Sequence, residues 1–174
     1  MTWPIDELKT AAIVFVVTIF QVSVLSSITL FGGSANLVLI TLVAVALLRG
    51  SIFGAAAGFF AGILIDTATL STLGVTALLL TLAGYWTGRY AETTGRDRAH
   101  APLVAVAVIT LLYAVGELVL NYMIGEDVSP AAAFHALPPT MLWNVLLAVP
   151  VYALCRRLLG ERTGERAREV QFFG

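Results

Sequence analysis

The chain has 174 residues, of which 59% are hydrophobic and 12% charged, and its formal net charge is −1. Soluble domains average about 45–50% apolar residues and about 25% charged ones, so this composition excludes an ordinary soluble domain and indicates an integral membrane protein. The near-zero charge without a basic stripe argues against nucleic-acid binding, and a single cysteine excludes a disulfide framework.

Six apolar runs are expected to form helices, at residues 10–30, 36–48, 52–65, 73–88, 102–124 and 138–155. A helix needs about 20 residues to cross a hydrocarbon core of about 30 Å, and the second and third runs are short. These two runs are either one long helix with Arg49 inside it or two helices that turn at Arg49-Gly50. Residues 1–160 are expected to form one membrane domain, followed by a charged cytoplasmic tail at 161–174.

The distribution of cationic residues distinguishes the two topologies. With six spans and a cytoplasmic N-terminus, every Lys and Arg falls on a cytoplasmic segment and the outer loops contain none. With five spans and the C-terminus kept in the cytoplasm, Lys9 would lie outside and Arg49 within the bilayer. An arginine there costs about 2.5–3.5 kcal/mol on insertion scales. The positive-inside rule therefore predicts six helices, both termini in the cytoplasm, and a cytoplasmic turn at Arg49-Gly50.

Small residues recur at every fourth position in the third and fourth runs, at Gly54, Gly58, Gly62, Gly84 and Gly88. This spacing lets two helix backbones approach closely in a membrane. Packing within the bundle is the simpler interpretation, and a surface for a partner's helix is the alternative. Leu79, between the two groups of glycines, is expected to face lipid.

Asp66 ends the third run and precedes the polar segment TATLST. An acid is not favoured at a helix C-terminus, because the helix dipole is negative there. Asp66 is therefore either a solvated helix end or an acceptor for hydroxyl groups or free amides of this loop.

Four polar side chains interrupt the apolar runs, namely Gln21, Glu117, Asn121 and Asn144. An ionisable group at membrane depth is a functional hypothesis by default. At 1.5 Å per residue, Glu117 and Asn144 lie about 10 Å and about 9 Å below the outer ends of their helices, so the two could meet. A structural hydrogen bond between a protonated Glu117 and Asn144 is the simplest interpretation. Proton or ligand handling and a partner contact are the alternatives.

Motifs for catalysis or for cofactors are missing from the sequence. It contains no P-loop, dinucleotide-binding fingerprint, nucleophile elbow or His-Glu motif. We therefore expect no enzyme activity, no cofactor and no metal.

The order of these features resembles the rod shape-determining protein MreD family. Members typically carry a Gln in the first helix, a Pro-Asn or Pro-Asp before the second, an Arg-Gly turn, a glycine-spaced third helix ending in Asp, a Leu-Gly, and a Gly-Tyr…Gly fourth helix. The matching residues are Gln21, Asn36, Arg49-Gly50, Gly54 to Asp66, Leu73-Gly74 and Gly84-Tyr85…Gly88. The resemblance covers about residues 20–90, and Ala35 stands where the family usually has proline.

The resemblance implies a non-catalytic, multi-pass component of the cell-elongation (rod) complex in the bacterial inner membrane. Its fold would be an all-α bundle of six transmembrane helices, similar to the substrate-binding subunits of energy-coupling-factor transporters. The implied partners are an MreC-like single-span scaffold protein, RodA, a class B transpeptidase, MreB, the lipid bilayer and a second copy of the chain. The alternative is a substrate-binding subunit of a vitamin-type transporter, for which Glu117 and Asn144 would line the pocket.

Overall fold

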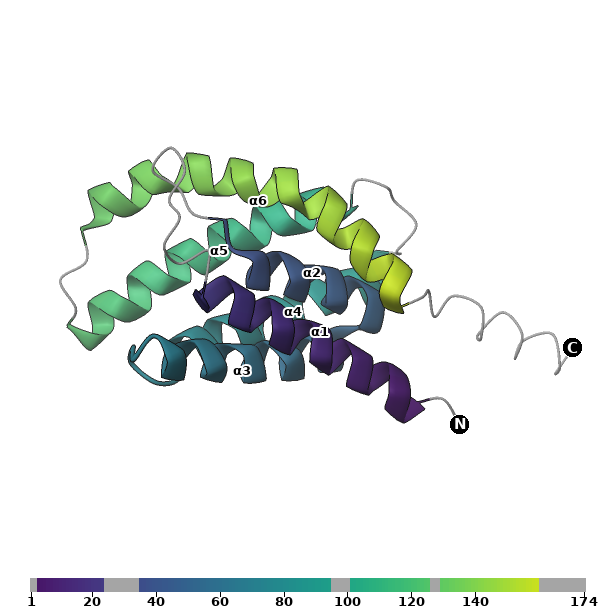
Figure 1. Cartoon of the computed structure of the whole chain (residues 1–174). Coiled ribbons are helices and arrows are strands. Elements are labelled where there is room, and N and C mark those ends of the chain that lie inside the picture. Colours follow the sequence, from purple (N-terminus) through teal and green to yellow (C-terminus); the bar gives the residue numbers. More distant parts are fainter. Residues whose placement is uncertain (1–2, 24–34, 95–100, 126–128, 160–174) are drawn as a thin grey trace, which may run out of the picture.

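The computed structural model describes residues 3–23, 35–94, 101–125 and 129–159. These residues contain helices and turns but no strand, as the composition predicts (Figure 1). The helices are α1 (Trp3–Ser23), α2 (Leu37–Arg49), α3 (Ser51–Ala68), α4 (Val75–Thr94), α5 (Ala101–Ile124) and α6 (Pro130–Leu159). Within these described ranges, three segments are long and apolar enough to cross a membrane, Ser51–Ala68, Pro102–Ile124 and Ala131–Leu159. Shorter apolar segments form most of α1 and all of α2.

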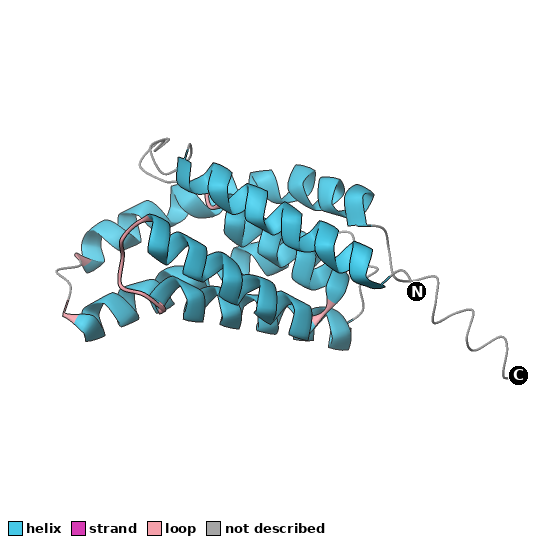
Figure 2. Cartoon of the chain, turned by 60° about the horizontal axis from the view of Figure 1, so that its bottom comes forward, coloured by secondary structure: helices cyan, strands magenta, loops and turns pink. Residues whose placement is uncertain are grey.

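The short helix α2 lies in the middle of the bundle (Figure 1). It contacts each of the other five helices, and its residues from Val38 to Arg49 are all buried. In the turned view the helices lie side by side along one common direction (Figure 2). A helix that is apolar on every side is expected to be buried, and the surrounding helices provide this burial. At 1.5 Å per residue its 13 residues extend only about 20 Å.

The chain forms two helices, and not one, around Arg49. Helix α2 ends at Arg49 and α3 begins at Ser51. Gly50 connects them with φ +96°, a conformation that residues with a Cβ rarely adopt. Its backbone N–H donates to the carbonyl oxygen of Ala46 at 2.9 Å, which closes the last turn of α2.

The glycines of α3 lie against the backbone of α4. A Cβ added at Gly54 would lie 2.6 Å from the carbonyl oxygen of Gly84, and one added at Gly58 would overlap the carbonyl group of Leu80. Added Cβ atoms at Gly62 and Gly88 would overlap Ala77 and Ser51. The small residues therefore allow contact between α3 and α4 within one chain. The face of α3 that they form is covered by α4.

Leu79 was expected to face lipid, and this prediction is wrong. Its side chain is buried, and its Cδ2 atom would lie 2.5 Å from a Cβ on Gly116 of α5. Leu78 and Leu82 are the exposed leucines of this part of α4. The apolar run alone does not tell which of its leucines point inward, because nearly every position in it is hydrophobic.

Helix α6 begins eight residues earlier than the sequence analysis predicted, at Pro130 and not at residue 138. Proline suits the first position of a helix, and the side chain of the preceding Ser129 accepts a hydrogen bond from Ala132 N–H at 3.5 Å. Pro138 and Pro139 lie inside α6, which arches over the bundle in Figure 1. Helix α1 likewise begins before residue 10, at Trp3. Its predicted end at 24–30 and the predicted tail at 161–174 lie outside the described residues.

Candidate functional site

Polar side chains from three helices meet at the N-terminus of α2. Asn36 precedes this helix, and its Oδ1 accepts a hydrogen bond from Leu39 N–H at 3.0 Å. The backbone N–H of Asn36 donates to Oδ1 of Asn144 on α6 at 2.9 Å. The Nδ2 of Asn144 donates to Oγ1 of Thr110 on α5 at 3.1 Å. Asn144, fully buried, therefore joins α6 to both α2 and α5.

Gln21, near the end of α1, holds the other side of the same segment. Its Nε2 donates to the carbonyl oxygen of Ala35 at 3.1 Å, and its Oε1 accepts from Leu37 N–H at 2.8 Å. The first amides of a helix have no partner within the helix. Here side chains accept hydrogen bonds from the amides of Asn36, Leu37 and Leu39. These bonds fix where α2 begins inside an apolar bundle.

These hydrogen bonds around the start of α2 form a capping network. Beyond the N-terminus of α2, a cavity of about 330 Å³ lies between α5 and α6. Its polar lining residues are Asn36, Thr110, Tyr113, Glu117, Asn121, Thr140 and Asn144. Its apolar lining residues are Leu39, Ala114, Leu118, Ala133, Ala136 and Leu137. Among the described residues, the lining of the cavity contains one acid and no Lys, Arg or His side chain.

The predicted hydrogen bond between Glu117 and Asn144 is absent from the described part of the chain. Both residues line the cavity, but the amide of Asn144 is used by Asn36 and Thr110. The depth estimate placed Glu117 and Asn144 at a similar level and could not identify the partner of either one. Thr110 could not be identified from the sequence, because a threonine in an apolar helix commonly bonds to its own backbone and carries no distinctive signal.

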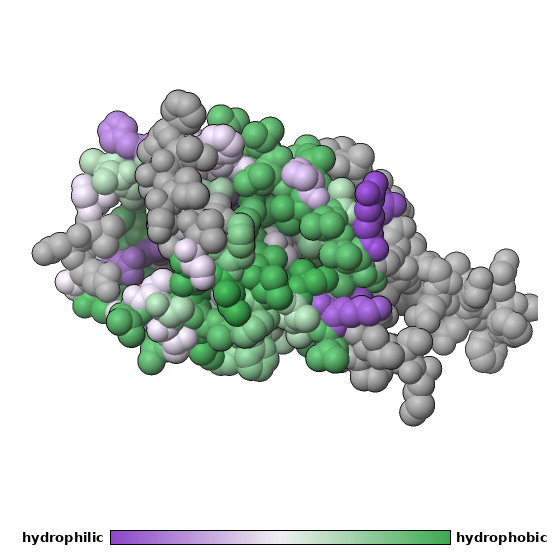
Figure 3. Space-filling view, in the orientation of Figure 1, coloured by the Kyte–Doolittle hydropathy of each residue, from purple (hydrophilic) through white to green (hydrophobic). Residues whose placement is uncertain are grey.

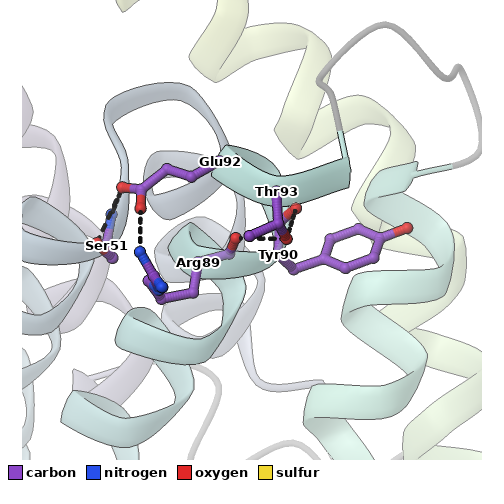
Figure 4. Close-up of polar contacts among 5 residues, drawn as sticks. All are labelled: Ser51, Arg89, Tyr90, Glu92 and Thr93. Carbon is purple, nitrogen blue, oxygen red and sulfur yellow. Dashed lines mark hydrogen bonds and ion pairs between the residues drawn. The ribbon is translucent and has the colours of Figure 1, made fainter.

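At the opposite end of α2, the start of α3 is capped from α4. Oε1 of Glu92 accepts hydrogen bonds from the backbone N–H and the Oγ of Ser51, at 2.8 Å and 2.9 Å (Figure 4). Arg89, one turn earlier, forms an ion pair with Glu92 at 3.5 Å. Glu92 lies beyond the expected span 73–88, and the hydrogen bonds from Ser51 followed by the charge of Arg89 lower its pKa. Glu92 was also missed, although an acid near a helix C-terminus is the same signal that drew attention to Asp66.

Arg49 ends α2 and is buried. Its Nη2 donates to the carbonyl oxygen of Leu159 at 3.3 Å. A cation is favoured at a helix C-terminus, and here Arg49 also bonds to the last residue of α6. The contact places the ends of α2 and α6 side by side.

Asp66 is fully buried and caps α4. Its Oδ2 accepts from Gly74 N–H at 2.8 Å and from Ala77 N–H at 3.4 Å, and its Oδ1 accepts from Ser71 Oγ at 3.3 Å. Asp66 is therefore an acceptor for a hydroxyl group and for free amides, and not a solvated helix end. Gly74 has φ +97°, which brings its amide to the carboxylate at a position where other residues would be strained.

The described residues include no group of three or more His, Cys, Asp or Glu side chains that could hold a metal ion. Several polar side chains cap helices, and several threonine hydroxyls bond to the backbone of their own helix. Within the described residues, Glu117 and Asn121 do neither. The described part of the chain therefore provides structural caps at helix ends and a polar cavity.

Comparison with known proteins identifies the family. A family model described as rod shape-determining protein MreD matches residues 7–161. Neither the comparison with curated proteins nor that with solved structures gave a match. The family match extends well beyond residues 20–90, on which the sequence resemblance rests, and includes the α2 capping network and the cavity. The chain belongs to the rod shape-determining protein MreD family.

Proposed function

We propose that this chain is a non-catalytic, six-span scaffold of the cell-elongation complex in the bacterial inner membrane. In this role it binds an MreC-like single-span protein and helps to organise peptidoglycan synthesis near RodA, a class B transpeptidase and MreB. The observation that carries the proposal is the family match over residues 7–161, since the family is one of rod shape determination. The buried side chains that cap neighbouring helices, such as Asn144 and Asp66, fit a rigid scaffold.

The arrangement of charges supports a topology with both termini in the cytoplasm. The start of α1 and the end of α6 lie at the same end of the bundle (Figure 1), and Arg49 contacts the last residue of α6. The visible face is apolar across its middle, with hydrophilic residues toward the two ends (Figure 3). This pattern suits a bilayer that surrounds the middle of the bundle.

The packing also narrows where a partner's helix can bind. Because α4 covers the glycine face of α3, this face is not available to an MreC-like helix. We therefore propose that the partner contacts another surface of the bundle.

Cysteine labelling tests the topology. In a Cys155→Ala background, Leu73→Cys and Thr93→Cys place single thiols at exposed positions before and at the end of α4. An impermeant thiol reagent added to intact cells should label Leu73→Cys and should label Thr93→Cys only after lysis. Labelling of Thr93→Cys in intact cells would overturn the topology.

Co-purification tests the scaffold function. The full chain, co-expressed with a tagged MreC-like protein, should be retained by the tag and should restore rod shape to cells that lack their own family member. A tagged single-span protein unrelated to cell elongation is the control. If the chain neither binds the MreC-like protein nor restores shape, the proposed function is wrong.

A further inference from the structure

Two polar side chains of α5 face the cavity without using their hydrogen-bonding capacity. Glu117 and Asn121 are one helical turn apart, both line the cavity, and neither makes a hydrogen bond within the described part of the chain. Most polar side chains around them, by contrast, are engaged in the α2 cap. Polar groups at membrane depth are costly unless they have a partner. The pair therefore requires either water or a ligand with hydrogen-bond donors.

The charges around the cavity select the sign of that ligand. The part of the lining that the structure describes contains one carboxyl group, from Glu117, and no cationic side chain. The N-terminus of α2 would be the natural place to bind an anion, but side-chain oxygens already accept hydrogen bonds from its amides at Asn36, Leu37 and Leu39. An anion would thus meet the carboxyl group of Glu117 without a cationic side chain in the described lining to compensate it. A cationic group would be paired by that carboxylate and by the amide oxygen of Asn121.

The size and the walls of the cavity indicate what kind of molecule carries the cation. Its volume is about 330 Å³, and since a water molecule occupies about 30 Å³, there is room for about ten groups of that size. Leucine and alanine side chains from α2, α5 and α6 form the rest of the lining, with Leu39, Leu118 and Leu137 the largest. Small-molecule sites combine such apolar walls with a few polar groups that orient the ligand.

We propose that this cavity binds a small organic amine, with its ammonium group between Glu117 and Asn121 and its apolar body against the leucines. This activity goes beyond the scaffold role and does not rest on it. Because of the carboxyl group of Glu117, we expect anionic ligands not to bind in the cavity.

Equilibrium dialysis of the purified full chain in lipid nanodiscs tests the proposal. The probe is radiolabelled benzylamine, which is protonated at pH 7, and empty nanodiscs give the blank for partition into lipid. Binding should saturate at one molecule per chain. Unlabelled benzylamine should compete, whereas benzyl alcohol and benzoate, which share its ring but not its charge, should compete at least tenfold more weakly. Binding that does not saturate, or equal competition by benzoate, overturns the proposal using the wild-type chain alone.

Matched variants locate the site. Glu117→Gln should weaken benzylamine binding at least tenfold, and Asn121→Ala should weaken it severalfold. Ala136→Leu fills the cavity and should abolish binding, whereas Ala132→Leu adds the same bulk on an exposed part of α6 outside the lining and should leave it unchanged. Unchanged binding in both Glu117→Gln and Ala136→Leu would overturn the assignment. Because the assay needs no partner protein, its outcome is separate from that of the shape and co-purification tests.

Discussion

Asn144 is the residue whose replacement should disturb the bundle most specifically. It is fully buried, and its amide links the backbone N–H of Asn36 at 2.9 Å to the hydroxyl of Thr110 at 3.1 Å. Asn144→Ala removes both hydrogen bonds. It also leaves the amide of Asn36 without its acceptor, at a position that α1, α5 and α6 surround.

The magnitude follows from these two contributions. Hydrogen bonds between membrane helices average about 0.6 kcal/mol each, so the loss of two contributes about 1.2 kcal/mol. A buried donor left without a partner costs about 1–3 kcal/mol. Since Asn144 also lines the cavity, water can reach the freed amide and reduce this cost. We expect the free energy of unfolding to fall by about 1–3 kcal/mol in total.

The measurement is unfolding of the purified protein in mixed micelles by added dodecyl sulfate, followed by far-ultraviolet circular dichroism. Asn121→Ala is the matched control, because Asn121 is the same residue type and lines the same cavity but makes no hydrogen bond in the described residues. Its unfolding free energy should change by less than about 0.5 kcal/mol. Equal losses in Asn144→Ala and Asn121→Ala would refute the role assigned to the network.

Three further predictions use the same unfolding assay. Gly58→Ala should lower the free energy of unfolding by about 1–3 kcal/mol, because the new Cβ overlaps the Leu80 carbonyl group. Ala56→Leu, on the exposed side of α3, should leave the stability unchanged. Equal stability of the two variants would contradict the packing of α3 against α4. Asp66→Ala should lose about 1–3 kcal/mol because the amides that begin α4 lose their acceptor, and an unchanged stability would contradict the cap. Glu92→Ala should destabilise the protein at pH 7, and should destabilise it less as the pH falls below about 4. The reason is that the pKa of Glu92 is lowered in the folded state. The stability that Glu92 contributes is therefore present above the ordinary carboxyl pKa of about 4.3 and is lost on acidification through the folded value. A difference as large at pH 3 as at pH 7 would refute this linkage.

The helices themselves could largely be predicted from the sequence. The expected ranges 36–48 and 102–124 differ by one residue or less from α2 and α5, because runs of apolar residues mark where a helix can be surrounded by lipid or by other helices. Helix α6 was less predictable, since the apolar run that predicts it begins only at residue 138. Proline inside a helix removes hydrogen bonds but does not always end it, and the Ser-Pro pair at 129–130 was the better signal for the first turn.

The members of the capping network could be recognised, but their contacts could not. Gln21 and Asn144 stand out because polar side chains are rare in apolar runs. Asn36 stands at an N-cap position, directly before a helical run. The depth of a residue along its helix can be estimated from the sequence, whereas the direction in which its side chain points depends on the rotation of the helix. For this reason Asn144 was paired with Glu117, when its partners are Asn36 and Thr110.

The capping network and the cavity have a common origin in the length of α2. The capping network joins Asn36 to Asn144, and Asn144 to Thr110. Beyond Thr110, α5 continues for 14 residues to Ile124, and α6 begins 14 residues before Asn144, at Pro130. At 1.5 Å per residue these extensions reach about 21 Å past the start of α2. Because α2 begins inside the bundle, its first amides need acceptors from α1 and α6. Because α2 does not extend into the space beyond its first residue, α5 and α6 line an open cavity there. The same short central helix therefore requires the polar residues that hold the bundle together and creates the site where an amine can bind.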